Sequence, residues 1–494
     1  MPSSSDRKED YQKSLKATGI TGLAQIFQIA IKIINTKVVA ILLGPAGVGI
    51  IGLFQSSVVL ISTVSGLGLG NSAVRDVAKA DKEGDSERIS LTIQSLRRLV
   101  WITGTAGAIF CLLAGGWLSR ISFNSDEYSL SFRILGLMVL LNQVSAGQLA
   151  LLQGLRKLKE LALVSVIGSA AGLAVACPLY WWFGISGIVP ALILLSIVPV
   201  LVAYFYSSRI TLASLPFSLE KFRETALPML KLGASTMLSS LALVLVMWLI
   251  RIMVQRKFGL QGVGQFQAGW GVTTIYLQMI FQAMGRDYYP RLSGHAGDKS
   301  GMQKLVNQQL HLALLLGTPL LLLAMTAAPL IIRLLYSSSF QGAVSQLQWL
   351  AFGTLFKLIS WPLGFVLLAL RKSTVYLITE CISSAIFLIL TIGLTDIFGL
   401  DGIGLAYSLN YILYAGIVLI SARKFIRFGF DGDSIQFLII STLACIIVFY
   451  SVFVRQNTLI FFTSVTVTTG VSAFYLVKLN QLTGILKSLW VRIR

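Results

Sequence analysis

The stretch GPAGVG at residues 44–49 returns as GLQGVG at residues 259–264, 215 positions later. Three further landmarks keep the same offset, and they are Lys16 with Lys231, Arg156-Lys157 with Arg371-Lys372, and FGISGI at 183–188 with FGLDGI at 398–403. A constant offset over most of the chain predicts two copies of one structural unit in tandem. Each glycine-rich turn allows the chain to reverse tightly between two helices.

The composition places both copies in a membrane. Of 494 residues, 55% are hydrophobic and only 12% are charged, whereas soluble domains are about 25% charged. Basic residues outnumber acidic ones by 40 to 20, which gives a net charge of +20. Basic proteins often bind nucleic acid, but a mean hydropathy of +0.79 makes membrane topology the better explanation of this excess.

Long apolar runs predict an all-α polytopic membrane protein, because a helix needs about 20 apolar residues to cross the hydrocarbon core. The fourteen expected spans are 17–41, 47–70, 96–119, 130–153, 161–182, 188–206, 232–253, 264–285, 309–333, 347–370, 375–397, 403–421, 435–454 and 458–477. Six helices make up each copy, so the two copies have the same orientation and the last two spans are appended.

Most of the 40 basic residues fall in alternate connections and in the two tails. The positive-inside rule therefore places both termini in the cytoplasm. The expected organisation is a cytoplasmic segment 1–16, an N-terminal lobe 17–206, a cytoplasmic linker 207–231, a C-terminal lobe 232–421, an appended pair 435–477 and a basic tail 478–494. Two parallel six-helix lobes are typical of an alternating-access transporter, with its substrate site near the midplane between them.

The first span carries a polar stripe. Thr21, Gln25, Gln28, Lys32 and Asn35 share one helical face, because their spacing follows the helical repeat. Such a stripe either lines a cavity or hydrogen-bonds to a neighbouring helix, and we favour the cavity.

Two further cations lie nearer to the expected outer ends of spans. Lys37 either faces the same cavity or extends to the headgroups, and Arg251 is open to the same two interpretations.

Lys357 and Glu380 lie at mid-span, where an ionisable group costs about 2.5–3.5 kcal/mol and usually marks function. They either form a structural ion pair, or Lys357 binds an anion while Glu380 takes a coupling proton or cation. The 215-residue offset pairs Lys357 with Asn142 and Glu380 with Ser165, so the architecture tolerates neutral residues there. It likewise pairs Lys32 with Met247 and Lys37 with Ile252.

The eighth span carries a second polar face, which includes Trp270 and Gln278, and it ends at Arg286. Arg286 is either ordinary cytoplasmic charge or part of the cavity. Several cations with few carboxylates suit an anionic substrate, because lysine offers a point charge and arginine a bidentate fork to phosphate. Aromatic and amide side chains add contacts suited to sugars, and they are Trp270, Tyr276, Trp361, Tyr407, Asn410, Tyr411 and Tyr414.

Some of these stretches resemble a known family. Residues 42–50 (LLGPAGVGI) are similar to the signature turn of Wzx-type O-antigen flippases. Residues 262–270, 275–278 and 289–293, with Lys357 and the stretch around Glu380, resemble the lipid III flippase subgroup of enterobacterial common antigen synthesis. The similarity runs over about residues 15–425 and extends to the wider MOP superfamily, which includes MATE exporters and lipid II flippases.

The resemblance implies a V-shaped, two-lobed transporter in the bacterial inner membrane and not an enzyme. It would move an undecaprenyl-pyrophosphate-linked oligosaccharide from the cytoplasmic to the periplasmic leaflet. Its expected partners are this lipid-linked glycan, membrane lipids and other polysaccharide-assembly proteins, without nucleic acid. No bound cofactor or metal is expected, apart from a coupling Na⁺ or H⁺.

Two other functions remain as alternatives. A MATE-like drug exporter would need acidic residues inside the lobes, and the spans hold mainly Glu380, with Asp396 near an end. A membrane enzyme of glycan assembly would need a large extramembrane loop with paired acids, but Asp126-Glu127 lies in a short loop.

Overall fold

The computed structural model describes residues 4–210, 216, 218–454 and 458–483, and within these ranges every regular element is helical. The helices are α1 Ser4–Ser65, α2 Leu69–Glu83, α3 Ser86–Phe123, α4 Ser129–Gly154, α5 Leu158–Phe183, α6 Ile188–Ser208, α7 Leu219–Gly294, α8 Lys299–Thr326, α9 Ala328–Leu335, α10 Gly342–Ala369, α11 Ser373–Phe398, α12 Asp401–Ile426, α13 Gly432–Phe449 and α14 Thr458–Thr483. Short 3-10 turns lie at Gly184–Gly187 and Ser338–Phe340, and a π-helical turn lies at Tyr450–Val454.

The helices confirm a polytopic membrane protein. Eleven stretches of the described chain are long and apolar enough to cross a membrane. Three of them, Phe27–Ser65, Leu158–Ser208 and Leu219–Thr274, are 39, 51 and 56 residues long, and each contains two helices. The described residues therefore contain fourteen helical crossings, as the hydropathy pattern predicts.

The tandem repeat is visible in the backbone. Gly44 interrupts α1 at φ 62° and ψ −170°, and Gly259 interrupts α7 at φ 68° and ψ −174°. The same 215-residue offset relates two more pairs with positive φ, Arg156 (54°) with Arg371 (57°) and Gly184 (55°) with Gly399 (60°). Equivalent turns in the two copies thus adopt equivalent conformations, which sequence similarity alone does not require.

The chain divides into two compact units, residues 1–263 (unit 1) and residues 264–494 (unit 2). The division falls within α7, close to the Gly259 turn, and each unit is described here by itself. The lobe boundaries expected from the sequence stay predictions.

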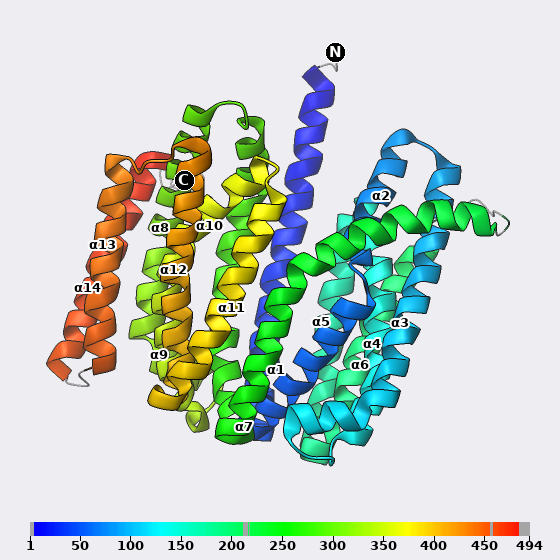
Figure 1. Ribbon diagram of the computed structural model, residues 1–494, viewed down its shortest axis with the longest axis horizontal. Coiled ribbons are helices and arrows are strands. Elements are labelled where there is room, and N and C mark those ends of the chain that lie inside the picture. The colour runs from blue at the N-terminus through cyan, green and yellow to red at the C-terminus, as the bar shows by residue number, and fades with distance from the viewer. Residues whose placement is uncertain (1–3, 211–215, 217, 455–457, 484–494) are drawn as a thin grey trace, which may run out of the picture. The chain divides into compact units, whose positions relative to one another are not determined.

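Unit 1 is a bundle in which α3 packs on α4, α4 on α6, α5 on α6 and α1 on α5 (Figure 1). Polar contacts join the second half of α1 to α7 and α3. The indole of Trp248 donates a 2.9 Å hydrogen bond to the Ser57 hydroxyl, which lies 3.4 Å from the Ser122 hydroxyl. All three groups are buried, so the contacts satisfy polar atoms inside the bundle.

Helix α2 was not expected, because the sequence analysis treated the basic segment after residue 70 as a connection. The expected span 47–70 ends at Ser65, since Leu67 (φ 47°) and Gly68 (φ 65°) adopt left-handed conformations that end the helix. The chain then forms α2, whose apolar face includes Leu69, Ala73 and Val77, all at most 1% exposed. These residues pack on α3, α4 and α7, so α2 caps the end of the bundle.

In unit 2, α10 packs against α8 and α12, and α11 packs against α12 (Figure 1). The appended α13 and α14 both pack on α8, where Phe437, Cys445 and Tyr475 join its apolar cluster. Thr318 donates a 2.9 Å hydrogen bond to Ser441. The appended pair is thus an integral part of unit 2.

Two more expected spans differ in detail from the helices. The expected helix 309–333 breaks at Ala327, because Pro329 in the first turn of α9 has no N–H to continue the α8 ladder. The expected helix 435–454 ends its regular part at Phe449 and continues as the π-helical turn.

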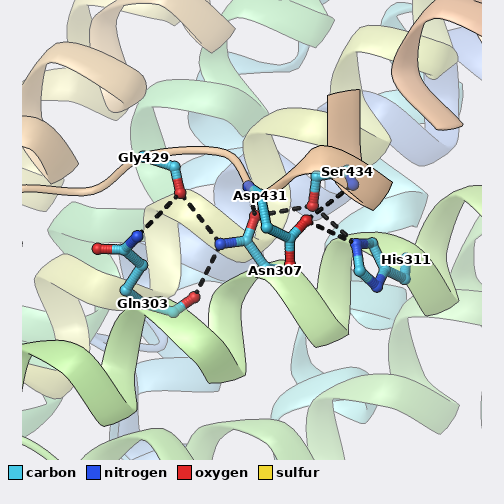
Figure 2. A network of polar contacts seen from close by, with 6 residues as sticks. All are labelled: Gln303, Asn307, His311, Gly429, Asp431 and Ser434. Carbon is cyan, nitrogen blue, oxygen red and sulfur yellow. Dashed lines mark hydrogen bonds and ion pairs between the residues drawn. The ribbon is translucent and has the colours of Figure 1, made fainter. Parts of the chain in front are cut away.

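A polar network fastens the α12–α13 connection to α8 (Figure 2). Asn307 donates to the Gly429 carbonyl at 3.0 Å and accepts from the Ser434 hydroxyl at 2.7 Å. The His311 Nε2 atom lies 2.8 Å from the Ser434 hydroxyl and 3.1 Å from Asp431 Oδ1. Burial raises the pKa of Asp431, but hydrogen bonds from Ser434 and the nearby His311 outweigh burial and hold the pKa below its ordinary value. His311 is therefore a hydrogen-bonded structural residue.

Candidate functional site

Lys357 lies among aromatic rings in the middle of α10. Its ammonium nitrogen is 5.1 Å from the centroid of Tyr411 on α12 and 5.9 Å from that of Phe281 on α7. The Tyr407 hydroxyl also contacts the ammonium group. A cation over an aromatic face gains about 2 kcal/mol when it is desolvated, which offsets part of the cost of placing a lysine at mid-span.

Glu380 is held by two phenols rather than by a cation. The Tyr414 hydroxyl on α12 donates a hydrogen bond to Glu380 Oε1, and Tyr376, one turn earlier on α11, contacts the same carboxylate. Lys357 and Glu380, both described, form no ion pair with each other. Of the two arrangements that the sequence allowed, the structural ion pair is absent from this structure.

The two charged groups nevertheless belong to one cluster. Tyr411 lies under the Lys357 ammonium group and is also near the Glu380 carboxylate, so it is a neighbour of both charges. Tyr407 also belongs to this cluster, because its ring centroid lies 4.7 Å from that of Tyr411. We call this set the α10–α12 polar cluster, and it comprises Lys357, Tyr376, Glu380, Tyr407, Tyr411 and Tyr414.

Trp270, a predicted substrate contact on α7, lies next to this cluster. Its ring stacks on Phe387 at 6.5 Å and meets Tyr407 edge-on at 5.6 Å. The structure therefore brings together Lys357, Glu380 and Trp270 from three separate stretches of the sequence. Gln278 and Arg286 lie in the same unit, but their side chains fall outside the described residues.

The chemistry of the cluster is that of a lysine surrounded by phenols. An ammonium group has three N–H donors, and phosphate oxygens are good acceptors for them. Phenol hydroxyls both donate and accept, which suits sugar hydroxyls and phosphate alike. Tyr407 and Tyr414 are only 2% and 6% exposed, whereas the other four members are half-buried, so the cluster is partly accessible from outside unit 2.

The predicted residues of α1 belong to unit 1 and are partly accessible. Gln25 and Lys32 are exposed, whereas Gln28, Asn35 and Lys37 are half-buried. The Asn35 side-chain oxygen is buried without a hydrogen-bond partner among the described residues. This face of α1 therefore has an unused hydrogen-bond acceptor.

Arg251, predicted on α7, donates a 3.0 Å hydrogen bond to the Met247 carbonyl one turn earlier. This contact orients the side chain along its own helix, within unit 1. It leaves open both interpretations from the sequence, the cavity and the headgroup region.

Unit 1 also contains a polar cavity of about 170 Å³ that the sequence analysis missed. It lies where α1 ends, between Gly68, Gln143 on α4, and Thr236 and Ser240 on α7. Gln143 donates a 2.6 Å hydrogen bond to the Ser62 carbonyl at its edge. The available signal was Gln143, an amide within the expected span 130–153.

Comparison with known proteins identifies relatives of the whole chain. A model of the family described as polysaccharide biosynthesis protein matches residues 14–295, more than half of the chain. The Lipid III flippase of Escherichia coli K12 is 22% identical over 419 residues, which cover 83% of this chain and 99% of that flippase.

Solved structures agree on the fold. A multidrug resistance MATE family transporter of the MOP superfamily, in an inward-facing conformation, matches with a TM-score of 0.70 at 18% identity, over 82% of this chain and 98% of its own. The lipid II flippase MurJ, in an inward closed conformation, matches with a TM-score of 0.68 at 16% identity, over 94% of this chain and 99% of its own. The chain therefore has the fold of MOP superfamily transporters, as the resemblance implied.

Proposed function

Because the chain belongs to the polysaccharide biosynthesis protein family, we propose that it is a flippase for a lipid-linked oligosaccharide. It moves an undecaprenyl-pyrophosphate-linked glycan, of the O-antigen or enterobacterial common antigen type, from the cytoplasmic to the periplasmic leaflet of a bacterial inner membrane. Alternating access carries the glycan, while the polyprenyl tail stays in the bilayer. The similarity to the Lipid III flippase over 83% of the chain supports this substrate class.

The observation that carries the proposal is Lys357 within the α10–α12 polar cluster. Its ammonium group is surrounded by phenols and aromatic rings and pairs with no described carboxylate. Lys357 is half-buried at mid-span, where a cation without a counter-ion is costly, and an anionic ligand lowers that cost. We propose that Lys357 contacts the pyrophosphate and that Trp270 and the tyrosines contact the glycan.

The remaining predicted residues complete the proposed path. Lys32, Lys37, Asn35 and the two glutamines of α1, with Arg251, Gln278 and Arg286, supply further cationic and amide contacts along the route. Glu380 has a separate proposed role as the acceptor for a coupling H⁺ or Na⁺. The tyrosine contacts on the carboxylate support this role, because they would loosen when the carboxylate takes a cation or proton.

A MATE-like drug exporter is the second candidate, supported by the fold alone. The two functions require opposite charges at the site, because cationic drugs need carboxylates and a pyrophosphate needs cations. In the α10–α12 polar cluster the sole carboxylate is engaged by phenols, whereas the lysine lacks an acidic partner among the described residues. This arrangement favours the anionic substrate.

A transport assay in proteoliposomes tests the proposal. Lys357→Gln should abolish translocation of a fluorescent undecaprenyl-pyrophosphate-linked oligosaccharide, because the amide keeps polarity but loses the charge. Lys299→Gln, at an exposed lysine that begins α8, is the matched control and should transport normally. Equal transport by both variants would overturn the assignment of Lys357.

The same vesicles test coupling. With Glu380 as the coupling site, a H⁺ or Na⁺ gradient accelerates translocation by the wild type, and Glu380→Gln loses that acceleration while it keeps substrate binding. Gradient-independent translocation would remove the coupling role from Glu380.

A further inference from the structure

A second groove lies on unit 1, lined by residues that neither the α10–α12 polar cluster nor the polar cavity contains. Its volume is about 190 Å³, and it is formed by α3, α4 and α6. Arg97 lies three turns from the start of α3, and Gln148 and Tyr204 lie in the last two turns of α4 and α6. All three therefore lie near one end of the bundle, the cytoplasmic end in the proposed orientation.

The walls of the groove are apolar, but its mouth is not. Leu96, Val144 and Val200 line the interior. At the mouth, Trp101 and Tyr204 are 55% and 58% exposed, and these two residue types prefer the interface between membrane and water. A concave apolar surface beneath an aromatic rim is suited to an acyl chain whose headgroup remains at the interface.

Two polar groups in this groove have unused bonding capacity. Arg97 is half-buried and pairs with no carboxylate among the described residues. The Gln148 side-chain oxygen is buried and accepts no hydrogen bond from any described group. A guanidinium group prefers phosphate, which it binds with two parallel hydrogen bonds, and an amide oxygen accepts from a hydroxyl.

The tandem repeat shows that the fold itself does not require these residues. At the 215-residue offset, the positions of Arg97, Trp101, Gln148 and Tyr204 are all leucines in unit 2, and these are Leu312, Leu316, Leu363 and Leu419. The same architecture is therefore built there without an arginine, an amide or an aromatic rim.

The repeat also indicates what covers this face. Leu312, the counterpart of Arg97, packs on the apolar cluster that joins α8 to the appended α13 and α14. Unit 1 has no counterpart of that appended pair in the described chain, so the part of α3 that carries Arg97 lacks such a cover. The other three counterparts lie elsewhere, since Leu363 and Leu419 pack in a separate cluster and Leu316 is 40% exposed. In a bilayer, lipid can therefore reach the Arg97 side of the groove.

We propose that this groove is a binding site for an anionic phospholipid of the cytoplasmic leaflet. Part of one acyl chain lies between α4 and α6, Arg97 binds the phosphate, and the Gln148 oxygen accepts from a headgroup hydroxyl. Phosphatidylglycerol provides all three features. The site requires only that the protein lies in a membrane, whatever substrate it transports. The lipid-site proposal can therefore be tested independently of the flippase proposal.

Native mass spectrometry of the purified full chain, titrated with phosphatidylglycerol or phosphatidylcholine, tests the site. We expect one phosphatidylglycerol to be retained in preference to phosphatidylcholine, and Arg97→Gln to weaken its retention about tenfold, as loss of a charged hydrogen-bonded contact predicts. Arg98→Gln is the matched control, because it removes the same charge from the adjacent, exposed position that does not line the groove.

A filling variant separates the groove from general surface charge. Val200→Phe leaves every charge in place and occupies the interior, so it should also reduce retention of phosphatidylglycerol. The proposal is overturned if Arg97→Gln and Arg98→Gln weaken binding equally, if the two lipids bind equally well to the wild type, or if Val200→Phe leaves retention unchanged.

Discussion

At the scale of single residues, the α10–α12 polar cluster shows how unit 2 accommodates charge at mid-span. Glu380 is stabilised by hydroxyl donors and Lys357 by ring faces, so neither needs the other as a counter-ion. This arrangement keeps the two charges independent. A ligand on Lys357 or a cation on Glu380 can then change one site without first breaking an ion pair.

The Tyr414 hydroxyl tests that account of Glu380. Tyr414→Phe keeps the buried ring and removes the hydrogen bond to the carboxylate, so it should lower the free energy of unfolding by about 1–3 kcal/mol. Unfolding in mixed micelles with increasing SDS measures the change. Tyr450→Phe, at a tyrosine that is 53% exposed, is the control and should have little effect. Equal losses in both variants would contradict a special role for the Tyr414 contact.

The sequence predicted the members of this cluster better than their contacts. Lys357 and Glu380 stood out because charge is rare within spans, and Tyr407, Tyr411 and Tyr414 were named among candidate aromatics. The contacts depend on how three helices rotate against one another, which no spacing within one helix reveals. Tyr376 was missed although it lies four positions before Glu380, where an i,i+4 pair shares one face.

At the scale of elements, apolar length and the 215-residue offset were sufficient to predict the crossings and their tandem arrangement. Helix α2 was harder to predict, because it is amphipathic, short and rich in charge, and its stability comes from packing on α3 and α4. The break at Ala327 was also missed, since apolar residues continue through it and only Pro329 marks the new start.

Among the elements, the turns at Gly44 and Gly259 depend most strongly on one residue type. Both adopt a φ and ψ combination that is essentially restricted to glycine, and no atom lies within 4 Å of a Cβ built at either position. Gly259→Ala should therefore lower the free energy of unfolding by about 1–3 kcal/mol through backbone strain alone.

A second glycine provides the matched comparison for Gly259. Gly393 lies inside α11 with equally open space around it and an ordinary helical backbone. Gly393→Ala should be neutral or slightly stabilising, because alanine favours the helix. Unfolding of the two variants in the same micelles measures both effects, and an equal response would show that the Gly259 conformation is not the cause.

At the scale of the whole molecule, the net charge of +20 can be related to membrane topology. Fourteen crossings are an even number, which is what the prediction of two cytoplasmic termini requires. Arg156 and Arg371 lie in equivalent connections, with the same left-handed backbone in both copies. Basic residues at such repeated positions are what the positive-inside rule requires of two parallel lobes, so we propose that the charge excess reflects membrane topology.

Cysteine labelling in cells tests this orientation. In a background without the four native cysteines, Glu127→Cys marks the exposed α3–α4 connection and Asp298→Cys marks the exposed α7–α8 connection. A membrane-impermeant maleimide that crosses the outer membrane should label position 127 in intact cells and position 298 only after the inner membrane is opened. The reverse pattern would mean that the protein has the opposite orientation in the membrane. It would then move the groove at Arg97 to the periplasmic leaflet and remove the charge argument for cytoplasmic termini.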